Sequence, residues 1–585
     1  MSPQFRLQAA LAALLLLAGT LLGGARAQQL PVPDDDDDDG APAAAAKPAP
    51  GPPANLPPQD LTAPLLYDIL LGEIAQQRGS AGFAAQTYLD LAKRTRDPRI
   101  ARRAVELATA ARMPDLALES ARAWQDADPK SLQALQTLVV LLVAQKRVDD
   151  TEPYLAKLLE SDANAAANGF MQMGRLLGSS ADTAANLRVV RKLADRYPQL
   201  PQAHFAVAQA ASAANDDMLA LGEIRRAAAL RPDWEIAAIY EAQLLQRGAT
   251  GEAAKRLAGF LEKYPDARDV RLNYARVLVL DKRDAEARGQ FEEIGKRFAT
   301  DADAIYAVGL LAMQVKEYDI AEASMKRLLE LNFRDPDAAR YALGQIAEER
   351  KDWPRAIEWY KTIQRSEHAL PARVRTANAI AKQGKLEEAR AYLRDAGAQG
   401  EQQVSLLVAE SQLLREANMH KEAFELLDGA LKRAPDQPDL LYDQALTAEK
   451  LDRFDVLESS LKRLIQLRPD HAHAYNALGY SYADRNIRLA EAKTLIERAL
   501  ELSPGDFFII DSMGWVLYRM GDLKGAVAQL QRAWRGRPDA EIGAHLGEVL
   551  WMLGERDEAR RVWQEALKSA PENETLQKTL KRFNP

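Results

Sequence analysis

The chain has 585 residues, of which 47% are hydrophobic and 28% charged, with a formal net charge of −7 and no cysteine. The missing cysteines exclude disulfides, thiol catalysis, thiolate metal sites and a lipid anchor attached through cysteine. A nearly balanced charge also argues against nucleic acid as the main partner.

The N-terminal segment has the pattern of an export signal. Arg6 precedes an apolar run, Leu11–Leu22, and Ala25-Arg26-Ala27 offers a cleavage site of the small-x-small type. The run is short for a membrane span of about 20 residues, so a cleaved signal over residues 1–27 is favoured over a retained anchor. We therefore expect a mature protein in the periplasm of a bacterial cell envelope.

Residues 28–60 are predicted to form a disordered linker rich in Asp, Pro and Ala. Six consecutive aspartates, Asp34–Asp39, are followed by an Ala/Pro stretch that cannot bury enough apolar surface to become ordered. The aspartates could attract calcium or a basic partner, but they lack ligand spacing and a glycine turn, so a solvated spacer is favoured. Loss of Arg6 and Arg26 takes the net charge from −7 to −9, and discounting the six aspartates leaves −3.

From residue 61 onward the chain is patterned as pairs of helices. The repeats are degenerate over 61–200 and clearer over 201–571, where small residues return about every 34 positions. The clearest series are Gly479, Gly514 and Gly547, then Ala492, Ala526 and Ala559, then Ala499, Ala533 and Ala566, and finally Pro504, Pro538 and Pro571. A unit this short cannot bury its apolar face alone, so copies must stack. The sequence predicts an all-α solenoid, an α-α superhelix of about 14 hairpins, with a capping helix over 572–585.

Each repeated position has a packing role. Gly514 allows the second helix to approach the first, and Gly521 and Gly554 end first helices in the left-handed geometry that glycine accepts. Pro538 closes its unit, because proline is tolerated at a helix start and not in the interior. Gly514→Arg is expected to overpack the pair at a cost of about 1–3 kcal/mol.

These positions resemble the tetratricopeptide repeat (TPR) family of helix–turn–helix units of about 34 residues. The resemblance implies a groove lined by the second, fifth, ninth and twelfth residues of each unit. In the last three units these places hold His473, Asn476, Tyr480, Ala483, Phe508, Asp511, Trp515, Tyr518, Glu541, Ala544, Glu548 and Trp551. The competing interpretation is that the rings pack between adjacent helices, and it stays open for Tyr480 and Trp515.

Motifs for chemistry are missing. The chain has no GxxxxGK[ST] phosphate loop, no HExxH, no nucleophile elbow and no dinucleotide fingerprint. His471 and His473 are close together, but two imidazoles alone make a poor metal site. We expect no catalytic residues, no cofactor and no metal, and therefore not an enzyme but a scaffold that binds other proteins.

The first helical segment, Leu65–Gly79, followed by Thr95-Arg96-Asp97-Pro98, resembles a proteobacterial envelope subfamily with an export signal, a linker and many repeats. One such member is the lipoprotein binding partner of a carboxyl-terminal processing protease, an outer-membrane adaptor that brings cell-wall hydrolases to the protease. The resemblance implies a periplasmic adaptor with that protease and peptidoglycan hydrolases as partners. The absent cysteine departs from the lipoprotein plan. The alternative is a scaffold for envelope assembly or polysaccharide export, and self-association stays open.

Overall fold

The computed structural model describes residues 60–584, apart from 162–163, 396 and 398. The predicted signal, residues 1–27, and nearly all of the predicted linker, residues 28–60, lie outside the described residues. The chain divides into two compact units, Met1–Gln145 and Lys146–Pro585. In the described residues no helix has both the length and the apolar character needed to cross a membrane.

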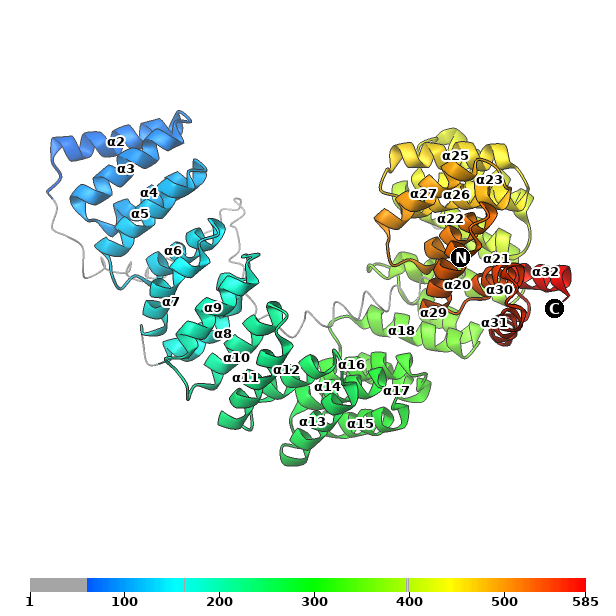
Figure 1. Ribbon diagram of the computed structural model, residues 1–585, viewed down its shortest axis with the longest axis horizontal. Coiled ribbons are helices and arrows are strands. Elements are labelled where there is room, and N and C mark those ends of the chain that lie inside the picture. Colours follow the sequence, from blue (N-terminus) through cyan, green and yellow to red (C-terminus); the bar gives the residue numbers. More distant parts are fainter. Residues whose placement is uncertain (1–59, 162–163, 396, 398, 585) are drawn as a thin grey trace, which may run out of the picture. The chain divides into compact units, whose positions relative to one another are not determined.

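The described part of the first unit, residues 60–145, contributes five helices that pack in sequence order (Figure 1). They are α2 (Ala63–Gln77), α3 (Ala81–Thr95), α4 (Pro98–Ala110), α5 (Pro114–Ala127) and α6 (Leu132–Ala144). Asp97 accepts a hydrogen bond from the Arg99 amide at 2.8 Å and so begins α4, with Pro98 at the first helical position. The core of this unit is made mainly of alanine and leucine, which allows the helices to lie close together.

The second unit continues the alternation of first and second helices. Its elements are η1 (Val148–Thr151), α7 (Glu152–Leu159), α8 (Ala165–Leu177), α9 (Thr183–Ala194), α10 (Pro201–Ala213), α11 (Asp217–Leu230), α12 (Glu235–Leu245), α13 (Thr250–Lys263), α14 (Arg268–Leu280), α15 (Asp284–Arg297), α16 (Ala302–Gln314), α17 (Tyr318–Glu330), α18 (Pro336–Glu349), α19 (Trp353–Lys361), α20 (Ala369–Lys382), α21 (Leu386–Arg394), α22 (Gly400–Glu416), α23 (His420–Arg433), α24 (Pro438–Lys450), α25 (Phe454–Leu467), α26 (Ala472–Asp484), α27 (Leu489–Leu502), α28 (Phe507–Arg519), α29 (Leu523–Gly536), α30 (Ala540–Leu553), α31 (Arg556–Ser569) and α32 (Glu574–Phe583).

The all-α solenoid predicted from the sequence is confirmed. Within the described residues, first and second helices follow one another fifteen times before α32, close to the predicted 14 hairpins. Consecutive helices make most of the contacts, and several first helices also touch the first helix of the next pair, as α26 touches α28. Stacking of this kind buries a continuous core between neighbours.

The pair α28–α29 shows why small residues recur. A Cβ added at Gly514 would lie 2.5 Å from Leu530 Cγ, so only glycine fits at this crossing. Leu530, together with Ala526 and Ala533 on the same helix, is fully buried. The other predicted packing residues, Gly479, Ala492, Ala499, Gly547, Ala559 and Ala566, also lie in buried positions between first and second helices.

Turns between helices follow the local sequence. Gly521 and Gly554 have φ values of 89° and 95°, in the left-handed region that favours glycine. The longer turn after α26 places Asn486 and Arg488 in the same region, at 56° and 46°. After α31, the short α32 turns Leu576 onto the preceding pair and its charged side outward, as a capping helix does.

Two second helices are shorter than their neighbours. α19 and α21 have nine residues each, whereas α23 and α25 have 14. After α19, residues 362–368 continue as turns and irregular chain before α20 begins. The sequence period does not reveal this shortening, because the small residues Ala356 and Ala389 keep their spacing.

Candidate functional site

The predicted groove residues lie on three consecutive first helices of the second unit: α26, α28 and α30. Seven of them are at least partly exposed, namely His473, Asn476, Tyr480, Phe508, Tyr518, Glu541 and Trp551. Three others are buried with exposures of 5% or less: Asp511, Trp515 and Glu548. The two predicted alanines, Ala483 and Ala544, are also buried. The structure therefore brings these residues together but divides them between an accessible surface and the packing beneath it.

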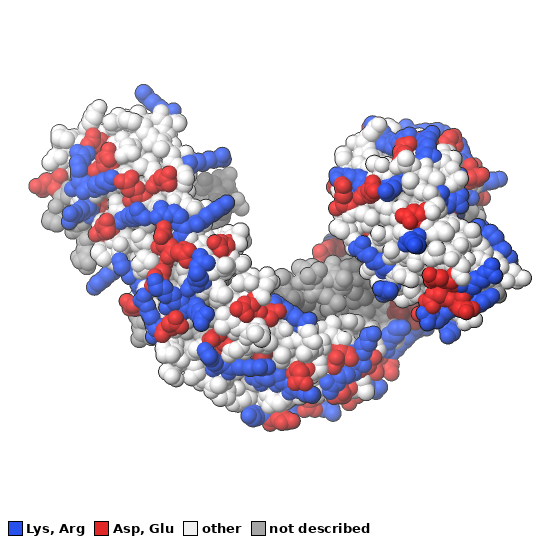
Figure 2. All heavy atoms as spheres, viewed as in Figure 1, with Lys and Arg blue, Asp and Glu red and all other residues white. Residues whose placement is uncertain are grey.

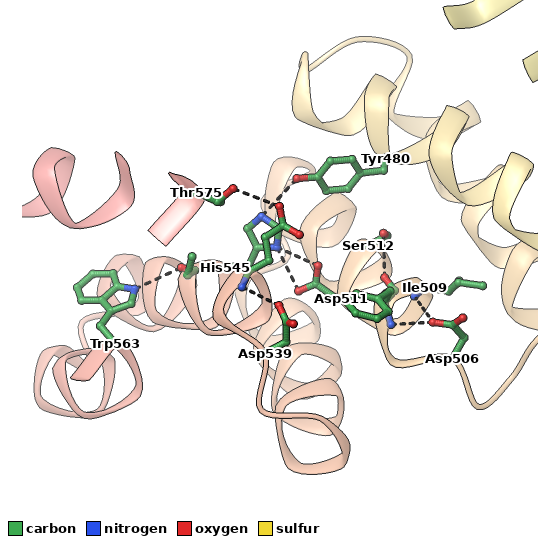
Figure 3. A network of polar contacts seen from close by, with 12 residues as sticks. Tyr480, Asp506, Ile509, Asp511, Ser512, Asp539, His545, Trp563 and Thr575 are labelled. Carbon is green, nitrogen blue, oxygen red and sulfur yellow. Dashed lines mark hydrogen bonds and ion pairs between the residues drawn. The ribbon is translucent and has the colours of Figure 1, made fainter. Parts of the chain in front are cut away.

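The buried part is organised around His545, which the repeat pattern does not single out (Figure 3). Its Nδ1 lies 2.9 Å and 3.1 Å from the two carboxylate oxygens of Asp511 on the neighbouring first helix. The Trp515 ring stacks on the imidazole with centroids 4.3 Å apart. On the opposite edge, Tyr480 Oη lies 3.4 Å from His545 Nε2. One histidine thus ties together α26, α28 and α30.

The protonation of His545 follows from this setting. Burial disfavours the charged imidazole, but the charge and hydrogen bond of Asp511 outweigh it and raise the pKa of His545 to about 9. The ring is therefore an imidazolium at neutral pH, with both N–H groups available to donate. A permanently charged, buried histidine is unsuited to act as a general base near neutrality.

A second buried carboxylate connects the last helices. Tyr518 on α28 donates a 3.1 Å hydrogen bond to Glu548 on α30, and Arg582 of the capping helix α32 forms an ion pair with the same carboxylate. Burial, followed by the charge of Glu548, raises the pKa of Tyr518 to about 12. Thr575, also on α32, donates to Glu541 at 3.2 Å (Figure 3). α32 therefore contacts two predicted groove residues of α30, Glu541 through Thr575 and Glu548 through Arg582.

The exposed part of the site curves inward. Neighbouring packed helices lie about 8–10 Å apart, so α26 and α30, separated by α28, would be about 20 Å apart in a flat stack. The 3.4 Å contact between Tyr480 and His545 requires their side chains to converge instead. The first helices thus form a concave surface.

We call this concave surface the acidic face and define it by Tyr442, Glu449, Tyr480, Asp484 and Glu541. Burial raises the pKa of the Glu449 carboxyl, the charges of Arg485 and Lys450 oppose this rise, and smaller effects of Asp484 and Glu541 reinforce it. Burial also raises the pKa of Tyr480 well above its usual value, with contributions from Asp484 and Glu541. Glu449, Asp484 and Glu541 therefore gather around Tyr480 on this surface, with Arg485 and Lys450 beside Glu449. Elsewhere on the visible surface the two signs of charge are interspersed (Figure 2).

The histidines considered for metal binding have other roles. His471 Nδ1 accepts a hydrogen bond from the Ala474 amide at 3.1 Å and begins α26. Among the described residues, one group with metal-like spacing is Asp335, Glu367 and His368, whose ligand atoms lie within 4.8 Å of one another. His368 lies 3.8 Å and 4.0 Å from the two carboxylates, which is ordinary ion-pair spacing.

The architecture defines the class of the protein, a solenoid of helical hairpins with a concave surface formed by first helices. A model of the tetratricopeptide repeat family matches residues 306–371, 442–507 and 512–574, and a second tetratricopeptide repeat model matches residues 244–313. The chain is 31% identical over 488 residues to the TPR repeat-containing protein PA4667 of Pseudomonas aeruginosa, covering 83% of this chain and 82% of that protein. The protein belongs to the tetratricopeptide repeat family.

Other relatives cover less or differ more. Cellulose synthase operon protein C of Pseudomonas fluorescens is 26% identical over 192 residues, which is 31% of this chain and 15% of that protein. Among solved structures, a thermophilic TPR protein of Thermus thermophilus is 24% identical with a TM-score of 0.29, covering 31% of this chain and 98% of its own. Yeast Tom70 covers 89% of this chain and 94% of its own at 13% identity and a TM-score of 0.32. Proteins of this family generally serve as scaffolds for protein interactions and are typically non-catalytic.

Proposed function

We propose that the protein is a non-catalytic adaptor whose acidic face binds a basic, extended segment of a client protein. The observation that carries the proposal is the gathering of Glu449, Asp484 and Glu541 around Tyr480, whose hydroxyl reaches His545 two first helices away, with Tyr442 beside Glu449. Excess negative charge in a concave, partly desolvated place attracts lysine and arginine side chains and excludes acidic ones.

The tyrosines add contact area to this charge. A lysine or arginine placed over the face of Tyr480 gains about 0.5–2 kcal/mol from the ring. Tyrosine also brings a large apolar surface at a low cost in side-chain entropy, which is why it is enriched where binding energy concentrates. The His545–Asp511 pair beneath keeps the Tyr480 ring in place, so the surface is preformed.

In the cell envelope this adaptor would present cell-wall hydrolases to a carboxyl-terminal processing protease. Support comes from the apolar N-terminal run with its small-residue cleavage site and from the resemblance of Leu65–Gly79 to the envelope subfamily. A long scaffold that holds two clients raises the effective concentration of one for the other without a new contact between them. This role places the protein in the periplasm, reached by an export signal.

A second candidate is a scaffold for envelope assembly or polysaccharide export. The similarity over 192 residues to a protein named for a cellulose synthase operon favours it. Both candidates use the same acidic face and differ in the client.

The test is site-specific crosslinking in cells. A photoreactive phenylalanine analogue replaces Tyr480, and the control carries it at Met520, which is 46% exposed at the end of α28 and outside the acidic face. We expect protein crosslinks from position 480. In a separate pull-down with the chain that lacks the analogue, Tyr480→Ala with Glu541→Gln should abolish recovery of the same client. Mass spectrometry identifies the client: a processing protease or hydrolase supports the first role, and export subunits support the second. Equal crosslinking from positions 480 and 520 would refute the acidic face as the binding surface.

A further inference from the structure

The shortened helices α19 and α21 leave a cavity in the outer layer of the second unit. Its volume is about 790 Å³, within the range of about 300–1,000 Å³ that is typical of ligand pockets. Residues 363–370 form one wall, and Tyr392 of α21 with Leu406 of α22 form the other. Its lining comes from α19, α21 and the N-terminal parts of the first helices α20 and α22, and it shares no residue with the acidic face.

Three cationic side chains line this cavity: Lys361, Arg365 and Arg373. Lys361 Nζ lies 5.4 Å from the centre of the Tyr392 ring, and the Arg373 guanidinium lies 5.0 Å from it. Arg373 also donates to the main-chain oxygen of Tyr392 at 3.2 Å. Within the part of the chain that the structure describes, none of the three cations has a carboxylate within ion-pair distance. The ring and main chain therefore hold two positive charges in place without neutralising them.

Comparable cavities between second helices are neutralised from within. Between α11 and α13, Arg225 and Arg256 contact the buried carboxylate of Glu241 at 2.9 Å and 2.5 Å. Both arginines of that cavity are therefore paired with a buried carboxylate.

The next cavity along the chain is neutralised in the same way. Arg390 and Arg394 contact the buried Glu410, which lies on α22. The corresponding place on α20 holds Thr376, since Thr376 precedes Ala389 by the same thirteen residues that separate Glu410 from Ala423. The neutralising acid is therefore replaced by a hydroxyl, and Thr376 uses it to donate to its own helix at 2.8 Å.

We propose that this cavity binds a multiply charged anion through carboxylate or phosphate groups. Arginine recognises both groups by charge-assisted hydrogen bonds, and lysine adds a mobile point charge. The Ser366 Oγ is buried at the cavity wall without a hydrogen-bond partner and offers a further donor. The one acidic residue of the lining, Glu367, has an 85% exposed side chain and lies beside His368. The anion is supplied either by a small molecule or by acidic side chains of a protein segment.

The experiment measures binding of three probes to the full chain, with Asp34–Asp39 replaced by asparagine so that the protein's own carboxylates do not compete. The probes are a fluorescent hexaglutamate peptide with blocked ends, citrate and inorganic phosphate, the last two as competitors of the peptide at low salt. The test variant is Lys361→Gln with Arg365→Gln. Neither side chain makes a hydrogen bond in the described structure, so helicity is expected to be unchanged. The control variant, Lys263→Gln with Arg535→Gln, makes the same charge change in the linings of two other cavities.

We expect the test variant to bind the peptide at least tenfold more weakly and the control variant to bind within twofold of the parent. If citrate or phosphate displaces the peptide at equal concentration, the site is assigned to small anions. Displacement only by a large excess assigns it to acidic protein segments. The proposal is overturned if no probe binds, or if the test and control variants lose the same affinity, since attraction would then be non-specific.

Discussion

Replacing His545 by glutamine tests whether the buried ion pair organises the acidic face. Glutamine keeps a polar group that can hydrogen-bond to Asp511 but carries no charge. In the wild-type chain the folded-state pKa of about 9 exceeds the unfolded value of 6.5. The stabilisation from protonated His545 is therefore complete below pH 6.5 and is lost as the pH rises from 6.5 through 9.

The size of the effect follows from these two pKa values. Each pKa unit corresponds to about 1.4 kcal/mol, so His545 contributes about 3 kcal/mol at pH 6 that is absent at pH 10. For a cooperative unit of about 150–250 residues, 1 kcal/mol shifts Tm by roughly 2–4 °C. The gap in Tm between wild type and His545→Gln should therefore be larger at pH 6 than at pH 10 by roughly 6–12 °C.

The assay is thermal melting followed by helical circular dichroism and by tryptophan fluorescence, which reports on Trp515 stacked on His545. His473→Gln is the matched control, because His473 lies on the same set of first helices with a 39% exposed side chain, 3.9 Å from Asp506. Its Tm should follow wild type at both pH values, as surface substitutions usually do. A gap for His545→Gln that stays constant from pH 6 to pH 10 would refute the ion pair as its source.

Two further predictions concern helix packing and buried charge. Gly514→Ala should lower the free energy of unfolding by about 1–3 kcal/mol, because the added methyl group overpacks the helix pair. Gly259→Ala, in open space within α13, should raise the free energy of unfolding by about 0.5–1 kcal/mol. Chemical denaturation of both variants checks the contrast. Glu410→Gln should lower the free energy of unfolding by about 2 kcal/mol, because it weakens the charged hydrogen bonds to Arg390. Glu387 pairs with the same arginine but its side chain is 74% exposed, so Glu387→Gln should cost under about 0.5 kcal/mol. Similar losses for the two variants would contradict a special role for burial.

The sequence predicted the fold well because repetition makes each packing position visible several times. Gly514 and its counterparts at 479 and 547 recur at one crossing, and a close approach of helices explains all three. The candidate site was predicted only in outline. The ninth position of a unit indicates that Trp515 faces neighbouring first helices, but not that the imidazole of His545 covers it.

The repeat pattern does not single out His545 or Arg582, because each occurs once and contacts a residue of another unit. Asp511 and His545 are 34 residues apart, as are Glu548 and Arg582. This separation is close to one repeat, so such pairs join neighbouring places of adjacent units. A search for opposite charges one period apart would have found both pairs. The shortening of α19 and α21 had no such signal, because the small residues around it keep their spacing.

The same geometry explains why α32 matters to the acidic face. Glu548 is buried to 2% exposure and needs a partner, and Arg582 supplies the charge that no residue of α30 or α31 provides. α32 also contacts Glu541 directly through Thr575. Its own Glu574 pairs with Lys578, which lowers the pKa of the Glu574 carboxyl, and the charge of Lys450 on α24 lowers it further. The capping helix therefore both ends the apolar core and contacts two predicted groove residues of α30, Glu541 and Glu548.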